Sequence, residues 1–147
     1  MFKKLLVASD GSALSGKAVR CAIELALVHE GQLLVVNVVP RYPMSCFEGA
    51  ASFSAEEIGA VGARCSQESR ELLDSIAHQA GAAGVKARTC AIGSDSVAKA
   101  LLATAKKHRC DLIVMASHGR RGIKRLLLGS ETQQVLAHTT LPVLVLR

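Results

Sequence analysis

Short apolar runs alternate with segments of helical periodicity along the whole chain, and no other feature constrains the fold as strongly. The apolar runs predict buried strands at residues 5–9, 33–39, 85–92, 111–116 and 142–146. The periodic segments predict helices at residues 12–29, 54–79, 93–108 and 130–138. Strands that alternate with helices form βαβ units. The sequence therefore predicts an α/β fold with a doubly wound, five-stranded and mainly parallel sheet, flanked by about four helices.

Single residues mark the boundaries of several predicted elements. Ser12 is a suitable N-cap for the first helix, and Gly31 is a suitable stop after it. The second strand is apolar except for Asn37 and ends at Pro40. Residues 41–53 mix Pro, Ser, Gly and aromatic residues without a period, which predicts a long surface loop.

The composition limits the classes of partner. Of the 147 residues, 50% are apolar and none is Trp, so residues 1–147 are expected to form a single domain with an aliphatic core. A formal net charge of +6 favours anionic partners such as nucleotides, nucleic acid or acidic proteins. Aromatic residues are too few for a stacking surface, which argues against nucleic acid.

The sequence shows no targeting or membrane segment. The apolar run at 5–8 is too short for a signal peptide, and no run reaches the roughly 20 residues of a membrane helix. We therefore expect a cytoplasmic protein without a membrane partner.

The cysteines and most histidines show no functional pattern. None of the five cysteines forms a C-x-x-C pair, so we expect reduced thiols and no metal site. Four histidines lie near predicted helix C-termini, where a partly positive imidazole suits the helix dipole. They are His29, His78, His108 and His138. We interpret them as structural.

Asp10 directly follows the first predicted strand. In a doubly wound sheet, ligands bind beyond the carboxyl ends of the strands, where the strand order reverses. A carboxylate at this place can accept hydrogen bonds from a ribose or an adenine amine. It can equally cap the first helix, and the sequence alone leaves both roles open.

A glycine-rich, basic segment links the fourth strand to the last helix, from residue 116 to residue 130. Its glycines let backbone N–H groups approach a phosphate, and the start of the helix adds a positive dipole end. Ser130 is a candidate N-cap or a phosphate ligand, and Arg120 contributes charge together with Arg121, Lys124 and Arg125. His118 is either a ligand contact or polar surface. The alternative for the whole segment is a flexible loop with a solvated basic face, since neither G-x-x-x-x-G-K-[ST] nor G-x-G-x-x-G occurs.

Four stretches resemble the universal stress protein family in their order and spacing. They are Lys4-Leu-Leu-Val-Ala-Ser-Asp10-Gly-Ser12, Cys110-Asp-Leu-Ile-Val-Met-Ala-Ser-His-Gly119, Leu128-Gly-Ser130 and Leu141-Pro-Val-Leu-Val-Leu146. The resemblance covers the chain apart from the predicted loop at 41–53. It implies a Rossmann-like fold of the adenine nucleotide alpha hydrolase type.

The nucleotide-binding branch of that family carries the pattern G-x2-G-x9-G-[ST]. Here the pattern falls on Ala116, Gly119, Gly129 and Ser130, with alanine in place of the first glycine. The resemblance implies that the last three of these residues hold the phosphates of a nucleotide.

The resemblance also implies roles at the ends of the first two strands. Asp10 would contact the adenosine, the main chain of Val38 would meet the adenine edge, and Ala8 and Ser9 would line the same pocket. The implied cofactor is ATP, with or without Mg²⁺. The complete set of expected nucleotide-binding residues is Ala8, Ser9, Asp10, Val38, Ala116, His118, Gly119, Arg120, Gly129 and Ser130.

Together these features predict an adenine-nucleotide-binding module of stress or energy signalling. No residue beside the phosphate segment is suited to activate water, so we expect at most slow ATP hydrolysis and no catalytic residues. The alternative is a family member that binds no nucleotide and acts as a dimeric interaction protein, which Ala116 favours.

The apolar strand from Pro142 to Leu146 is expected to lie at a sheet edge and to pair with a second copy, unless a helix of the same chain covers it.

Overall fold

The computed structural model describes residues 1–41, 54–120 and 128–147, and these residues form every predicted strand and helix. The elements are β1 (Lys4–Ala8), α1 (Ala13–Val28), β2 (Gln32–Val39), α2 (Ala55–Ala82), β3 (Lys86–Gly93), α3 (Val97–His108), β4 (Leu112–Ala116), α4 (Ser130–His138) and β5 (Val143–Leu146). Almost all of the loop predicted at 41–53 lies outside the described residues, as do Arg121, Gly122, Lys124 and Arg125.

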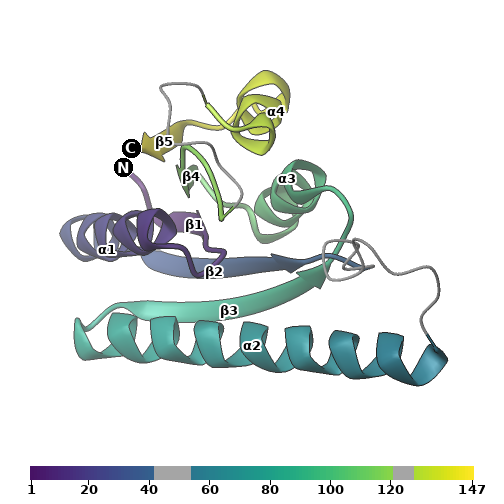
Figure 1. Ribbon diagram of the computed structural model, residues 1–147. Helices are drawn as coiled ribbons and strands as arrows, with labels where there is room; N and C mark the ends of the chain where they lie inside the picture. Colours follow the sequence, from purple (N-terminus) through teal and green to yellow (C-terminus); the bar gives the residue numbers. More distant parts are fainter. Residues whose placement is uncertain (42–53, 121–127) are drawn as a thin grey trace.

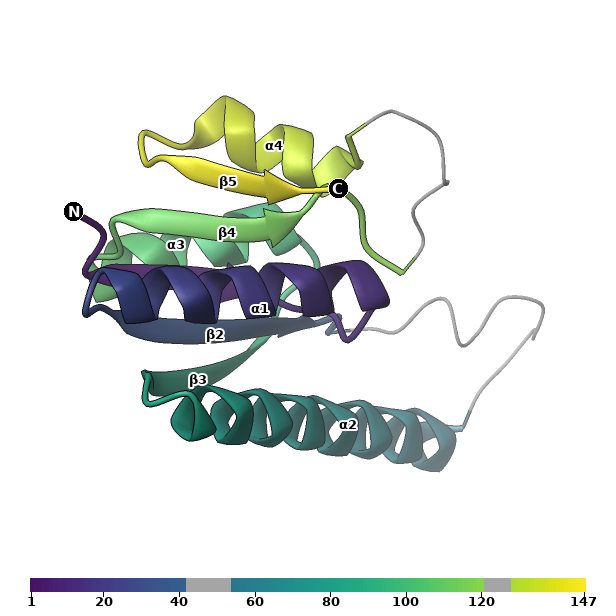
Figure 2. The same cartoon turned by 90° about the vertical axis from the view of Figure 1, so that its left-hand side faces the viewer.

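The five described strands form one sheet in the order β3-β2-β1-β4-β5, and every pairing is parallel. Helices α1 and α2 cover one face, and α3 and α4 cover the other (Figures 1 and 2). The doubly wound prediction is therefore confirmed. From β1 the chain moves outward to β2 and β3 and then returns to the other side of β1 as β4, so the strand order reverses between β1 and β4.

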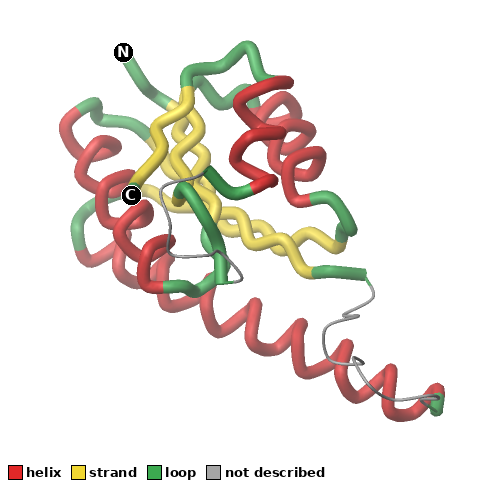
Figure 3. Tube along the Cα trace, turned by 45° about the horizontal axis from the view of Figure 1, so that its top comes forward, coloured by secondary structure: helices red, strands yellow, loops and turns green. Residues whose placement is uncertain are grey.

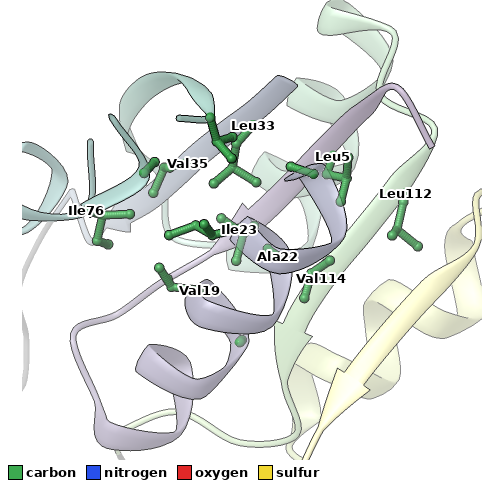
Figure 4. Close-up of a cluster of buried hydrophobic side chains, with 14 of the residues drawn as sticks. Leu5, Val19, Ala22, Ile23, Leu33, Val35, Ile76, Leu112 and Val114 are labelled. Carbon is green, nitrogen blue, oxygen red and sulfur yellow. The ribbon is translucent and has the colours of Figure 1, made fainter. Parts of the chain in front are cut away.

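Alternate residues of the central strands pack against α1 and α2 (Figure 4). From the strands this layer contains Leu5, Val7, Leu33, Val35, Leu112 and Val114. From the helices it contains residues such as Val19, Ala22, Ile23, Leu73 and Ile76. All of these side chains are aliphatic, as expected for a chain without Trp.

The intervening residues of the same strands pack against α3 and α4. Leu6, Leu34, Val36, Ile113 and Met115 meet Ala98, Leu101, Ala105 and Val135 on that face. Strands that are buried on both faces need apolar side chains at successive positions. This requirement explains why the sequence shows continuous apolar runs rather than alternation.

Helix α2 projects beyond the sheet at its N-terminal end (Figure 3). Its buried residues are confined to the second half, from Ser69 to Ala80. The first half carries no such anchor, and its start is fixed instead by a capping box between Ser54 and Glu57.

The first helix does not end as predicted, because Gly31 is not the residue that stops it. The helix stops at Val28 with His29 as C-cap, and the residue in the left-handed conformation is Glu30, with φ of 50°. Gly31 therefore does not supply the stop. A Cβ at Gly31 would lie 2.9 Å from the carbonyl oxygen of Phe2, so the close approach of these two segments is what requires glycine. Ser12 is the N-cap of α1, as predicted.

None of the helices in the described ranges is long and apolar enough to cross a membrane.

Candidate functional site

A cavity of about 160 Å³ lies at the carboxyl ends of β1, β2 and β4, where the strand order reverses. Its apolar wall comes from the sheet face that α3 covers and from α3 itself. Its polar rim comes from the loops that leave β1 and β4 and from the first turn of α4. The lining residues are Ala8, Ser9, Asp10, Ser15, Val36, Val38, Val97, Leu101, Met115, Ala116, His118, Gly119, Glu131 and Thr132.

The carboxylate of Asp10 ties together the two loops that form the rim. Its Oδ1 accepts a hydrogen bond of 2.9 Å from the backbone N–H of Ser12, and its Oδ2 accepts one of 2.8 Å from the backbone N–H of Arg120. Burial raises the pKa of this carboxyl group, but the hydrogen bonds from Ser12 and Arg120 outweigh burial and hold the pKa below its ordinary value. Asp10 is not the helix cap, because Ser12 fills that role.

Gly119 leaves the space that the Asp10 carboxylate occupies. A Cβ at Gly119 would lie 2.7 Å from Asp10 Oδ2, closer than non-bonded atoms tolerate. The glycine of the motif therefore has a function in the protein alone, because it lets the loop after β4 close onto the turn after β1.

A second contact fixes the start of α4 against the end of β4. Gly129 donates a hydrogen bond of 2.7 Å to the carbonyl of Ser117, and the hydroxyl of buried Thr132 donates to the carbonyls of Ala116 and Ser117. A Cβ at Gly129 would lie 3.2 Å from the Ser117 oxygen. The two ends of the motif thus meet directly.

Of the two roles that the sequence leaves open for Ser130, N-cap and phosphate ligand, the structure contradicts the N-cap. Gly129 is the N-cap of α4, and no side chain from the described part of the chain caps this helix end. Ser130 is the first helical residue, and it is exposed. Its hydroxyl thus makes no capping bond, and the backbone donors of the first turn are not used by a cap side chain.

Glu131 is a rim residue that the sequence analysis missed. Its Oε2 accepts a hydrogen bond of 2.7 Å from the backbone N–H of Ala98, so one carboxylate joins the N-termini of α3 and α4. An acidic residue in the first turn of a helix is a visible signal in a sequence. Its partner is not visible, since Ala98 lies 33 residues away.

Seven of the ten expected residues line the cavity: Ala8, Ser9, Asp10, Val38, Ala116, His118 and Gly119. The other three, Arg120, Gly129 and Ser130, do not belong to the described lining. The guanidinium of Arg120 lies over Gly11, at 2.8 Å from the place of a Cβ there. The sequence likewise did not reveal the apolar wall formed by Val36, Met115 and α3. Hydrophobic periodicity identifies these residues as buried but does not distinguish a cavity wall from the core.

Ala116 has an ordinary strand backbone. It is the last residue of β4 and is in register with Leu146 of β5, and its φ is not positive. Alanine at this motif position therefore imposes no backbone strain.

Four of the five cysteines lie within the described residues. Cys21, Cys65, Cys90 and Cys110 are free, and burial, reinforced by Asp111, raises the pKa of the Cys110 thiol. Within residues 1–41, 54–120 and 128–147, no three His, Cys, Asp or Glu side chains gather as metal ligands.

Comparisons with known proteins agree on one family. The model of the "Universal stress protein family" matches residues 1–147. Universal stress protein YxiE of Bacillus subtilis is 32% identical over the full length of both chains. Universal stress protein MJ0531 of Methanocaldococcus jannaschii is 30% identical, over 100% of this chain and 83% of the relative.

Solved structures share the fold. The structure of protein MJ0577 of M. jannaschii superposes with a TM-score of 0.83 at 22% identity, over 99% of this chain and 96% of that one. A universal stress protein in complex with cAMP superposes with a TM-score of 0.71 at 23% identity, over 99% and 97% of the two chains. The universal stress protein of Archaeoglobus fulgidus in complex with dAMP gives 0.68 at 17% identity, over 100% and 98%.

Proposed function

Since the chain belongs to the universal stress protein family, we propose that it binds an adenine nucleotide in the cavity at the carboxyl ends of β1, β2 and β4. The nucleotide is ATP, with or without Mg²⁺, and its occupancy is the signal that a stress-response partner reads. The observation that carries the proposal is the cavity itself, which lies at the strand-order reversal and brings together seven of the expected residues.

The chemistry of the cavity suits a nucleoside. An apolar slot from Val36, Val38 and Leu101 fits a planar base, and the rim carboxylate of Asp10 fits ribose hydroxyls. The backbone donors at the start of α4, next to Gly129, are not used by a cap side chain of the described residues, and they fit a phosphate. That two family members with this fold are complexed with cAMP and dAMP supports the same ligand class here.

Hydrolysis of a bound ATP is expected to be slow at most. The two carboxylates of the described lining, Asp10 and Glu131, both accept backbone hydrogen bonds. A carboxylate engaged in this way is poorly placed to take a proton from water. The bound nucleotide then acts as a signal rather than as a substrate.

The protein is further proposed to form a homodimer along β5. This strand is an edge of the sheet, and its residues Val143–Leu146 are all half-buried and apolar. Ile113 and Ser117 donate to the carbonyls of Pro142 and Leu146, so the backbone groups of the intervening odd-numbered residues face away from β4. A second copy of the strand would satisfy those groups. The cytoplasmic location stays a prediction.

Calorimetric titration with ATP, AMP and GTP tests the nucleotide proposal. We expect a Kd for ATP in the micromolar range, and weaker binding of GTP. No heat of binding at about 1 mM ATP would reject the nucleotide function. That result would favour the alternative, an interaction protein without a nucleotide.

A further inference from the structure

Asn37 is a buried polar residue in the apolar strand β2 and is 9% exposed. Its Nδ2 donates a hydrogen bond of 2.8 Å to the carbonyl of Ser9, and its Oδ1 accepts one of 2.6 Å from the hydroxyl of Ser69. A carbonyl oxygen can only accept, so the Asn37 amide nitrogen must face Ser9. The chemistry thus sets a single orientation of this side chain.

The Ser9 carbonyl is where the β1–β2 ladder ends. In a parallel pair of strands, the N–H of a residue donates to the carbonyl of the residue that precedes its register partner. Its C=O accepts from the N–H of the residue that follows that partner. Ser9 donates to the carbonyl of Val36 at 3.0 Å, so a continued ladder would have Val38 donate to the carbonyl of Ser9. Within residues 1–41 and 54–120, the strand register stops at Ala8 and Val36, and no backbone bond joins Val38 to Ser9. The amide of Asn37 has taken the place of the Val38 N–H.

The consequence is a pair of backbone groups directed at the cavity. Ser94 donates to the carbonyl of Val39, so Val39 faces β3 and the backbone groups of Val38 face the side of β1. The strand β1 has already ended there, and Val38 lines the cavity. Val38 therefore presents a neighbouring N–H donor and C=O acceptor to a ligand.

We propose that Asn37 is a positioning residue of the nucleotide site, and that Ser69 orients it. By occupying the Ser9 carbonyl, Asn37 ends the ladder one residue early and keeps the Val38 N–H available to the edge of a purine base. Ser69 holds the amide in the required orientation from α2. The recognition of a base rests on the proposed function, whereas the state of the Val38 N–H does not.

The side chains of Asn37 and Ser69 meet on the sheet face that α1 and α2 cover. Ser69 is 4% exposed on α2, which packs on the sheet face opposite α3, whereas the apolar wall of the cavity lies on the α3 face. Neither residue belongs to the described lining of the nucleotide cavity. They influence a ligand only through Ser9 and Val38.

The proposal predicts two changes in Asn37→Leu, slower amide exchange at Val38 and weaker binding of ATP. Amide hydrogen exchange at Val38 should slow at least tenfold, because the N–H pairs with the carbonyl of Ser9 once the amide is gone. Affinity for ATP should fall at least tenfold. Ser69→Ala should shift both quantities in the same directions by a smaller factor, and Ser69→Thr, which keeps the hydroxyl, should restore them.

Ile76→Val is the matched control, because Ile76 is buried from α2 on the same sheet face and its side chain has no polar atom that could join the hydrogen bonds of Asn37. A merely structural role predicts faster exchange at Val38 in Asn37→Leu, as in any destabilised variant. Faster or unchanged exchange in Asn37→Leu would overturn the proposal. Should Asn37→Leu not fold, unchanged exchange in Ser69→Ala would overturn it. If the wild type binds neither ATP nor AMP, the nucleotide function fails, and with it the role in base recognition. Slowed exchange at Val38 in Asn37→Leu would then still show that Asn37 keeps the Val38 N–H from pairing with the carbonyl of Ser9.

Discussion

The carboxylate of Asp10 accepts a hydrogen bond of 2.8 Å from the backbone N–H of Arg120, although 110 residues separate them in the chain. This bond closes the loop after β4 onto the turn after β1 and so builds the rim of the cavity. The same carboxylate also binds the N–H of Ser12. It therefore has a structural role in the protein alone, in addition to the proposed contact with adenosine.

We expect Asp10 to contribute to the pH dependence of stability. Its folded pKa lies below the ordinary value of 3.8, so the stabilisation is fully present above pH 3.8 and is lost as the pH falls through the folded pKa. The difference in unfolding free energy between wild type and Asp10→Asn should therefore shrink below pH 3.8. Urea unfolding of both proteins at several acidic pH values measures this difference in unfolding free energy. The other carboxyl groups titrate in both proteins, so their contributions cancel in the comparison. A difference that does not change with pH would contradict the expectation.

Gly119→Ala should weaken nucleotide binding. The new methyl group would lie 2.7 Å from Asp10 Oδ2, so the carboxylate must move and lose its bond to Arg120. We expect a loss in ATP affinity of at least tenfold, which corresponds to about 1.4 kcal/mol. Gly81→Ala is the control, because among the described residues nothing beyond the backbone of its own helix lies within 4 Å of a Cβ there. Equal ATP affinities of the two variants would show that the Gly119 contact is irrelevant to binding.

Glu131→Ala should destabilise the protein. The substitution removes the acceptor for the Ala98 N–H, and a lost hydrogen bond to a charged group costs about 1.5–3 kcal/mol when buried, and less at this partly exposed site. Glu56→Ala is the control, since Glu56 also lies in the first turn of a helix but is exposed. Chemical denaturation measures the loss of unfolding free energy in the two variants. The lost interaction with the helix macrodipole alone accounts for about 0.3–1 kcal/mol of that loss in each. Matching losses would mean that the bond to Ala98 adds nothing.

Val145→Pro should abolish the proposed dimer without unfolding the edge strand. The neighbours of Val145 in β5 bind β4, so its N–H faces the free edge, and proline is tolerated at such a position. Light scattering at about 100 μM should give a dimer for the wild type and a monomer for the variant, if the dimer Kd is micromolar. Circular dichroism checks that the variant folds. A wild type that is monomeric at this concentration would reject the dimer.

The sequence by itself determined the elements and their layers. Strand and helix positions follow from apolar runs and periodicity, which are local properties of the chain, and the caps at Ser12 and Ser54 depend on residues only three positions away. The family motifs located the rim through Asp10 and Gly119, because their spacing is readable without any structure. Local signals were wrong in three details. Gly129 rather than Ser130 caps α4, and Glu30 rather than Gly31 takes the left-handed turn. The helix predicted from residue 93 begins at Val97, because β3 continues to Gly93.

Tertiary structure alone decided which polar groups meet. Asn37 was visible as the polar exception in an apolar strand, yet its partners Ser9 and Ser69 lie 28 and 32 residues away. Glu131 likewise meets Ala98 only because α3 and α4 lie side by side on one face of the sheet. Such a partnership depends on strand order, helix orientation and the point at which a ladder ends. Periodicity contains none of these, because it records which side of an element is buried but not which neighbour buries it.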